Sequence, residues 1–232
     1  MCHSLFKQST RNNLKTLIFL RHGKTSYTGQ FPDLTEDGVN QISRAADEIR
    51  DIVGKGRKVR IVSSPLPRAL GTADIIAKKL GLPFSVIEQE VAIRCMDFHD
   101  ADAANAIWAS FASAREVDKA FWTDPRFEDG VVIEKRSDIQ RRFYTYLGSL
   151  FEQFVADKLP DVLIHTSHFE VLSGLAATFK FEEALIHGEV IKLELTRPID
   201  PVYVHVRATF REYSREFDCR LPADLFRTQF GV

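Results

Sequence analysis

Short apolar segments alternate with longer segments of helical periodicity over most of the chain. Five short runs have the composition of β-strands: Thr16–Leu20, Val59–Ser63, Phe84–Ile87, Val162–Thr166 and Val190–Leu195. Apolar strands that alternate with helices are typical of a mainly parallel sheet covered by helices on both faces. The pattern therefore predicts an α/β protein, a three-layer α/β/α sandwich with a mainly parallel central sheet.

Four segments have the periodicity of amphipathic helices. The first follows Thr35, a suitable N-cap, and has Glu36 and Asp37 in its first turn. Its apolar positions are Val39, Ile42, Ala46, Ile49 and Val53. The others run from about Pro67 to Leu80, before Gly81 and Pro83, from about Ser137 to Lys158, and for a shorter length after His168.

The stretch from Val91 to Lys135 does not alternate in this way. It is rich in alanine, aspartate and aromatic residues and lies between a predicted strand and the long helix. We expect a helical cap insertion at about residues 91–135, over the C-terminal edge of the sheet, within a single domain of residues 1–232. Near the C-terminus, Val202, Val204 and Val206 alternate with polar residues, as in an added strand.

Composition and charge narrow the class of protein. The 31 lysine and arginine residues nearly balance the 32 aspartate and glutamate residues. We therefore expect no nucleic-acid partner and no membrane partner, and any attraction for an anion must be local. The three cysteines form no disulfide framework, and the N-terminal apolar run is too short for a signal or membrane segment. These features favour a cytoplasmic protein, whereas the sequence is silent on oligomeric state.

Three predicted strands end in residues that suit a phosphoryl group. The segments are Arg21-His22-Gly23-Lys24-Thr25, Ser63-Ser64-Pro65-Leu66-Pro67-Arg68-Ala69 and Thr166-Ser167-His168. If these strands are parallel and adjacent, two arginines and two histidines meet at one edge of the sheet, where ligands of such folds bind. Guanidinium groups can hold the phosphoryl oxygens while a neutral imidazole attacks phosphorus. The residues therefore indicate phosphoryl transfer through a phosphohistidine.

The same residues match four sequence elements in a fixed order from about Thr16 to Leu195. The matched positions are Arg21, His22, Gly23 and Thr25; Asp33, Leu34, Thr35 and Gly38; Ser63, Ser64, Pro65, Arg68, Ala69, Thr72 and Ala73; and Ser167 and His168. In this respect the chain resembles the histidine phosphatase superfamily (phosphoglycerate mutase-like, branch 1). Four elements in register are far more specific than any one of them.

The resemblance implies a role for each matched polar residue. His22 would be the nucleophile, Arg21, Arg68 and His168 would form the phosphate pocket, and Thr25 would add a hydrogen bond. We expect a metal-independent phosphatase, without a cofactor, that takes a small phosphorylated metabolite and releases inorganic phosphate. The run His99-Asp100-Ala101-Asp102 has no second histidine at helical spacing, so we expect no metal there.

The chain departs from the family at two positions. Cys95 stands where a glutamate normally protonates the leaving alcohol, and Asp97, Asp100, Asp102 and Glu170 are alternative proton donors. Lys24 replaces the usual glutamate or glutamine after the glycine and adds a positive charge that can bind substrate. Arg94 either binds a substrate carboxylate or second phosphate, or forms a surface ion pair.

Two other functions remain open at this point. A phosphoglycerate mutase-type phosphotransferase would return the phosphoryl group to a bound acceptor instead of water. A phosphate-ester-binding protein would keep the arginine site with weak or lost turnover, a hypothesis that Cys95 favours. His165 lies within a predicted strand, where a structural role is expected.

Overall fold

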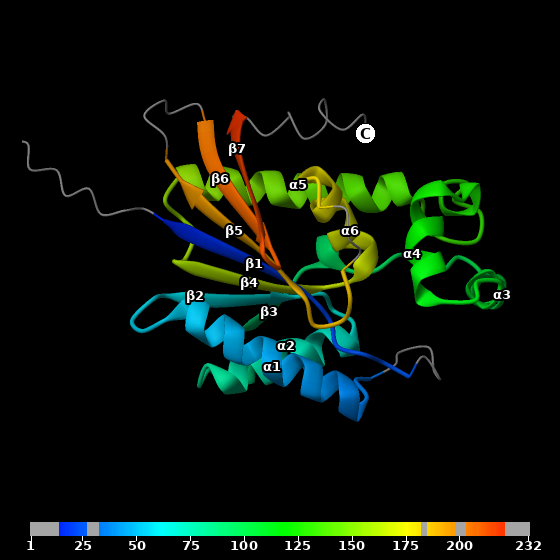
Figure 1. The fold of residues 1–232 in the computed structure, drawn as a ribbon, viewed down its shortest axis with the longest axis horizontal. Coiled ribbons are helices and arrows are strands. Elements are labelled where there is room, and N and C mark those ends of the chain that lie inside the picture. Colours follow the sequence, from blue (N-terminus) through cyan, green and yellow to red (C-terminus); the bar gives the residue numbers. More distant parts are fainter. Residues whose placement is uncertain (1–13, 27–32, 182–184, 198–202, 221–232) are drawn as a thin grey trace, which may run out of the picture.

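A computed structural model describes residues 14–26, 33–181, 185–197 and 203–220. Within these residues, one seven-stranded sheet has the order β3-β2-β4-β1-β5-β6-β7 (Figure 1). The strands are β1 (Lys15–Arg21), β2 (Val59–Ser63), β3 (Ile87–Gln89), β4 (Val162–Ser167), β5 (Val190–Thr196), β6 (Tyr203–Phe210) and β7 (Tyr213–Arg220). Strands β1, β2, β3, β4 and β6 point one way, and β5 and β7 point the other way.

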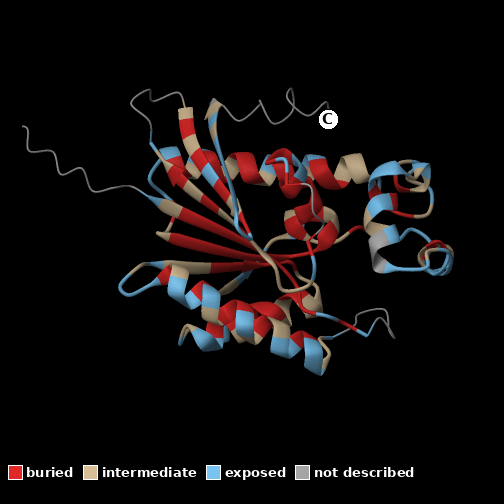
Figure 2. Ribbon diagram, viewed as in Figure 1, coloured by how far each residue is buried: buried red, intermediate tan, exposed pale blue. Residues whose placement is uncertain are grey.

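Helices cover both faces of the sheet. Helices α1 (Glu36–Val53) and α2 (Pro67–Lys79) lie on one face, and α5 (Arg136–Val155) and α6 (Phe169–Thr178) lie on the other (Figure 1). Strand β1 contributes to both cores, because Ile18 and Leu20 face α1 while Leu17 and Phe19 face α5. The burial of strand β1 is visible in Figure 2, where buried residues are red. The predicted three-layer α/β/α fold with a mainly parallel sheet is confirmed.

The boundaries of several elements differ from the sequence-based expectation. Residues Phe84–Val86 form a 3-10 turn (η1), and the strand follows at Ile87–Gln89. Val39 was expected on the buried face of α1, but it is 40% exposed, since the face that packs on the sheet centres on Ile42, Ala46 and Ile49. Helix α5 ends three residues before Lys158, because Asp157 adopts a left-handed conformation with φ 55°.

The C-terminal hairpin was only partly expected. Strand β6 corresponds to the predicted alternation of valines, of which Val202 lies outside the described residues. Strand β7 was not predicted. It is joined to β6 by a two-residue turn, Arg211-Glu212, in which Arg211 has φ 53°. Such turns favour asparagine or glycine, so this pair carries no recognisable hairpin signal.

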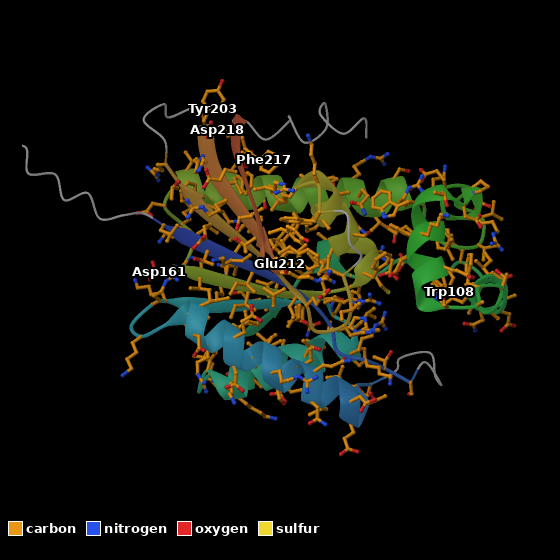
Figure 3. The ribbon with its side chains drawn as sticks, in the orientation of Figure 1. Trp108, Asp161, Tyr203, Glu212, Phe217 and Asp218 are labelled. Atoms are coloured by element: carbon orange, nitrogen blue, oxygen red, sulfur yellow. The ribbon has the colours of Figure 1, made fainter. Side chains whose placement is uncertain are left out.

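Residues 91–135 form a helical segment beyond the C-terminal ends of β1 and β4. It contains the 3-10 turns η2 (Val91–Ile93) and η3 (Pro125–Phe127) and the helices α3 (Ala101–Ala109) and α4 (Ala114–Thr123). Trp108 and Phe121 pack on Phe127, with ring centroids 5.2 and 5.6 Å apart. In Figure 3, Trp108 lies far from Asp161, which precedes β4 at the opposite end of the sheet. Within the described residues, no helix has the length and apolarity needed to cross a membrane.

Candidate active site

The ends of three parallel strands bring the predicted functional segments together. The order β2-β4-β1 places Ser63 beside Thr166 and Arg21 beside Ser167. The pairing continues one residue further, because the amide of His22 donates to the carbonyl of Ser167 at 3.0 Å. The residues that follow these strands therefore start from neighbouring backbone positions at one edge of the sheet, in accordance with the general placement of ligand sites in α/β folds.

His22 is held in one orientation at the end of β1. Its side chain is buried, and Nδ1 lies 2.8 Å from the carbonyl oxygen of Gly23. A carbonyl only accepts, so Nδ1 carries the proton and Nε2 carries the lone pair. The Nε–H of Arg68, in the first turn of α2, donates to this Nε2 at 3.2 Å. The lone pair on Nε2 of His22 thus accepts a hydrogen bond from a guanidinium group.

The surroundings of His22 keep its imidazole neutral. Burial lowers the pKa of His22 well below its usual range, and the positive charges of Arg68 and Arg21 lower it further. The hydrogen bond to the carbonyl of Gly23 acts in the opposite direction and is outweighed. A neutral imidazole is nucleophilic without a separate base. The imidazole of His22 is therefore uncharged at neutral pH.

His168 lies beside His22, with ring centroids 5.0 Å apart. It is fully buried and is the N-cap of α6. Its Nε2 lies 2.7 Å from Oγ of Ser64, which accepts a hydrogen bond from the amide of Leu66 at 3.3 Å. A hydroxyl can donate one hydrogen bond and accept two, so this contact is compatible with either neutral tautomer of His168. Burial lowers the pKa of His168 well below its usual range, and it too is neutral.

Arg21 is buried and fixed from two sides. Its Nη1 donates to the carbonyl of Leu185 at 2.5 Å, and its guanidinium carbon lies 5.2 Å from the ring centroid of Phe169. Its Nη2 lies 3.4 Å from Nε2 of His187. This network orients the guanidinium before any ligand binds.

Several buried polar atoms near His22 have no protein partner. Within the described residues, three of the five such side-chain atoms are Arg21 Nε, His168 Nδ1 and Thr25 Oγ1. Buried polar groups in proteins are almost always hydrogen-bonded, so unpartnered ones indicate a ligand site. The three groups can all donate a hydrogen bond, which suits an anion with several oxygens.

His187 belongs to this cluster although the sequence analysis did not single it out. Its ring centroid lies 5.4 Å from that of His22, and burial together with the charge of Arg21 lowers its pKa to about 3. The neutral ring accepts from Arg21 and helps to hold it. The feature of the sequence that could have indicated this is the position of His187 just before β5. Strand β5 runs antiparallel to β1, so the start of β5 lies beside the end of β1.

Two predicted substrate-binding residues are engaged elsewhere. Lys24 Nζ forms an ion pair with Asp37 at 2.9 Å, and both side chains are largely exposed. Arg94 Nη1 lies 2.5 Å from Asp97 and 3.1 Å from Glu134. Of the two alternatives given for Arg94 from the sequence, substrate binding or an ion pair, the structure shows the ion pair. The positive charge of Lys24 also contributes to the low pKa of His187.

The alternative proton donors have very different surroundings. Burial, with a smaller effect of Glu170, raises the pKa of Cys95 to about 11, and its thiol donates to the carbonyl of Met96 at 3.3 Å. Asp100 accepts from the amide of Ala103 as the N-cap of α3. Asp102 is exposed in the first turn of α3. Asp97 is paired with Arg94, as described above, whereas Glu170 lies in the first turn of α6.

Two glycines let the loop after β1 pack on α1. A Cβ on Gly23 would lie 2.6 Å from the carbonyl oxygen of Gly38, and a Cβ on Gly38 would lie 2.2 Å from that of Lys24. In the structure it is the contact with α1 that requires the absence of a side chain, and this contact places His22.

Replacement of Gly38 by alanine should therefore displace the loop. We expect Gly38→Ala to lower the free energy of unfolding by about 1–3 kcal/mol, because backbone must move to admit the methyl group. Gly71→Ala in α2 is the matched control, since its Cβ would lie 3.6 Å from Leu34, an ordinary contact. The Gly71→Ala control should have a free energy of unfolding about 0.5–1 kcal/mol higher than that of wild type, because alanine favours the helical conformation over glycine. Urea unfolding of both variants measures the difference, and equal stabilities would contradict the packing argument.

The comparisons with known proteins agree with this geometry. The family model described as histidine phosphatase superfamily (branch 1) matches residues 17–191, more than half of the chain. The chain belongs to the histidine phosphatase superfamily. A comparison with curated proteins finds no match. The resemblance inferred from the sequence motifs is confirmed, and membership supports a phosphoric monoester hydrolase.

Solved structures share the fold at low sequence identity. The mycobacterial glucosyl-3-phosphoglycerate phosphatase is 21% identical, with a TM-score of 0.58 over 84% of this chain and 97% of that chain. The phosphoglycerate mutase from Bacillus anthracis str. Sterne is 18% identical, with a TM-score of 0.57 over 79% and 88%. The phosphoserine phosphatase from Entamoeba histolytica, in complex with 3-phosphoglyceric acid, is 19% identical, with a TM-score of 0.51 over 77% and 90%. At these identities the likeness concerns the fold.

The cluster offers no obvious metal ligands. Within the part of the chain that the structure describes, no three His, Cys, Asp or Glu side chains are grouped so that they could hold a metal ion.

Proposed function

We propose that this histidine phosphatase is a metal-independent phosphatase that hydrolyses a small phosphorylated metabolite through a phosphohistidine on His22. The observation that carries the proposal is the pair of contacts made by this imidazole. Nδ1 is held by Gly23, and Nε2 is left with a lone pair that points to Arg68. The phosphatase neighbours, one of them in complex with 3-phosphoglyceric acid, support a small phosphorylated substrate.

In the first step, the phosphoryl group takes over the donors around His22. Its oxygens accept from Arg68, which then releases the lone pair of His22, and from the free Nε–H of Arg21. Nε2 attacks phosphorus and forms the N–P bond while the bond to the leaving oxygen breaks. The arginines stabilise the charge that spreads over the three phosphoryl oxygens, which is the main source of catalysis in phosphoryl transfer.

In the second step, water attacks the phosphohistidine. The N–P bond breaks, inorganic phosphate leaves, and His22 returns to its neutral form with the lone pair on Nε2. In the tautomer in which Ser64 donates to its Nε2, neutral His168 donates through Nδ1–H and binds an oxygen in both steps without repelling the arginines. Thr25, whose buried hydroxyl has no partner among the described residues, supplies a further hydrogen bond.

The phosphoenzyme itself provides the test. The wild-type protein in EDTA should release phosphate from p-nitrophenyl phosphate, and acid-free rapid quenching into base should trap one phosphoryl group per chain. A phosphoramidate is stable in base and labile in acid, so the bond is identified by its stability. Turnover that stops in EDTA, or a phosphoenzyme stable in acid, would contradict the proposal.

The mutase alternative differs only in the acceptor. A phosphotransferase would pass the phosphoryl group from His22 to a bound alcohol and would require a bisphosphate to prime it. Phosphate release in the absence of any such primer identifies the phosphatase. Primer-dependent transfer without net phosphate release would identify the mutase.

A further inference from the structure

Ser64 contacts the second imidazole of the site, that of His168. Its Oγ lies 2.7 Å from Nε2 of His168, and neither residue has any exposed surface. Taken alone, this contact permits two neutral forms of His168, with the ring proton on Nδ1 or on Nε2. Nδ1 is a donor in the first form and an acceptor in the second. The choice between the two forms therefore decides whether His168 attracts or repels the oxygens of a phosphoryl group.

The turn after β2 holds the hydroxyl of Ser64 in place. Oγ of Ser64 accepts a hydrogen bond at 3.3 Å from the amide of Leu66, two residues further on, in the manner of a serine turn. Leu66 is the N-cap of α2, so its amide has no partner within the helix. The amide of Ser64 itself donates to the carbonyl of Thr166, at the end of β4, at 2.9 Å. Backbone contacts on two sides thus fix Ser64 beside His168.

The hydroxyl hydrogen of Ser64 has a single acceptor among the described residues. The two hydrogen-bond contacts of its Oγ there are the amide of Leu66, which is a donor, and Nε2 of His168. A hydroxyl has one hydrogen to donate, and a buried donor without an acceptor is costly. The hydrogen bonding of Ser64 is therefore complete only when its hydroxyl donates to Nε2 of His168.

The two neutral forms of His168 leave different numbers of buried groups unpaired. With the proton on Nδ1, the contact with Ser64 is satisfied, and only the Nδ1–H has no partner among the described residues. With the proton on Nε2, two groups lack a partner there, the hydroxyl hydrogen of Ser64 and the lone pair of Nδ1. Burial lowers the pKa of His168 well below its usual range, so a doubly protonated ring does not compete. Hydrogen-bond satisfaction therefore favours the proton on Nδ1.

We propose that Ser64 is a positioning residue that selects the Nδ1–H form of His168, so that this ring donates a hydrogen bond to the phosphoryl group. The identity of this anion rests on the phosphatase function proposed above. The ring centroids of His168 and His22 lie 5.0 Å apart, and the free Nε–H of Arg21 is a further buried donor of the site. His22 also carries its proton on Nδ1, but it uses the lone pair of Nε2, whereas His168 uses its Nδ1–H.

NMR spectroscopy of the whole protein measures this tautomer directly. In a protein with isotopically labelled histidine ring nitrogens, two-bond couplings to the ring C–H groups distinguish a protonated nitrogen from an unprotonated one. The signals of His168 are identified by their absence from His168→Gln. At pH 7.5 without substrate, we expect His168 to carry its proton on Nδ1. Inorganic phosphate should then shift the signal of this Nδ1–H downfield as it gains an acceptor. A wild-type His168 with its proton on Nε2 would overturn the proposal.

Ser64→Ala tests whether the hydroxyl makes the selection. Without a donor to Nε2, His168 should populate both neutral forms, and kcat/KM for p-nitrophenyl phosphate should fall by about 10-fold, the effect of one hydrogen bond. Ser64→Thr keeps the hydroxyl and should keep the Nδ1–H form. Ser173→Ala is the matched control, because it removes another buried hydroxyl, on α6, which donates to the carbonyl of Glu170 at 3.3 Å. The control should keep the wild-type tautomer and the wild-type kcat/KM.

A purely structural role of Ser64 would give a different result. Loss of packing alone would lower activity without a change in tautomer, so a Ser64→Ala protein with His168 still fully protonated on Nδ1 contradicts the proposal. The wild-type spectrum needs no variant and decides the tautomer even where Ser64→Ala does not fold. Failure of the phosphatase function is distinguishable, because the Nδ1–H form would then persist in a protein that neither hydrolyses p-nitrophenyl phosphate nor forms a phosphoenzyme.

Discussion

His22→Ala is expected to lower kcat by about 10⁴–10⁶-fold and to remove the phosphoenzyme, which is the largest effect we predict for this protein. The arginines and His168 remain in the variant, so a substrate can still bind, but no lone pair stands opposite the leaving group. The loss should therefore appear in kcat and not in the affinity for inorganic phosphate. Steady-state kinetics, base-quenched phosphoenzyme trapping and phosphate binding by calorimetry measure the three quantities.

His205→Ala is the control for this experiment. His205 lies on β6, where Nδ1 is 2.9 Å from Asp218, and it is only partly buried. It pairs with Thr196 at the end of β5, which lies beside the start of β1, whereas His22 follows the other end of β1. We expect normal turnover from this variant. If His22→Ala retains wild-type turnover, phosphorus is not attacked by His22 and the proposed mechanism is wrong.

Replacement of Arg68 should have the second largest effect and should also change the pH dependence. Arg68 donates through Nε to His22 and presents further donors in the same plane, which a lysine ammonium does not reproduce. We expect Arg68→Lys to lower kcat/KM by about 10²–10³-fold, comparable to the loss of one donor to a developing charge.

The pH profile separates the geometry of Arg68 from its charge. Arg68 is among the groups that lower the pKa of His22, and only neutral His22 attacks. Wild-type kcat/KM should therefore remain constant as the pH falls from 7.5 through 6.5, the usual pKa of histidine. Arg68→Gln removes the positive charge, so the pKa of His22 rises and the acidic fall in activity moves to higher pH.

Arg68→Lys keeps the charge and should keep the wild-type position of this acidic limb. Kinetics with p-nitrophenyl phosphate between pH 4.5 and 8 compare the two variants. Identical acidic limbs in Arg68→Gln and Arg68→Lys would show that the charge of Arg68 does not control the protonation of His22.

Much of the site was predictable because it depends on local signals at strand ends. Apolar runs located β1, β2 and β4, and the residues directly after them were His22, Ser64 and His168. Adjacent parallel strands present their C-terminal ends at the same edge of a sheet. If the three strands are neighbours, the residues that follow them must therefore lie close together. The order β2-β4-β1 satisfies that condition.

Other features depend on contacts between distant segments and have no local signal. His187 enters the site only because β5 pairs antiparallel with β1, which brings the start of β5 beside the end of β1. Likewise, a lysine or arginine in a motif carries no indication of its partner. Lys24 pairs with Asp37 and Arg94 with Glu134 because tertiary packing brings these charges together.

The sequence by itself determined the fold class, the family and the four side chains expected to meet around an anion, because strand periodicity and residues at strand ends are encoded locally. Only the tertiary structure decided which nitrogen of His22 carries the proton and which groups support Arg21. These depend on burial and on which segments pack together, and both arise only when the whole chain has folded.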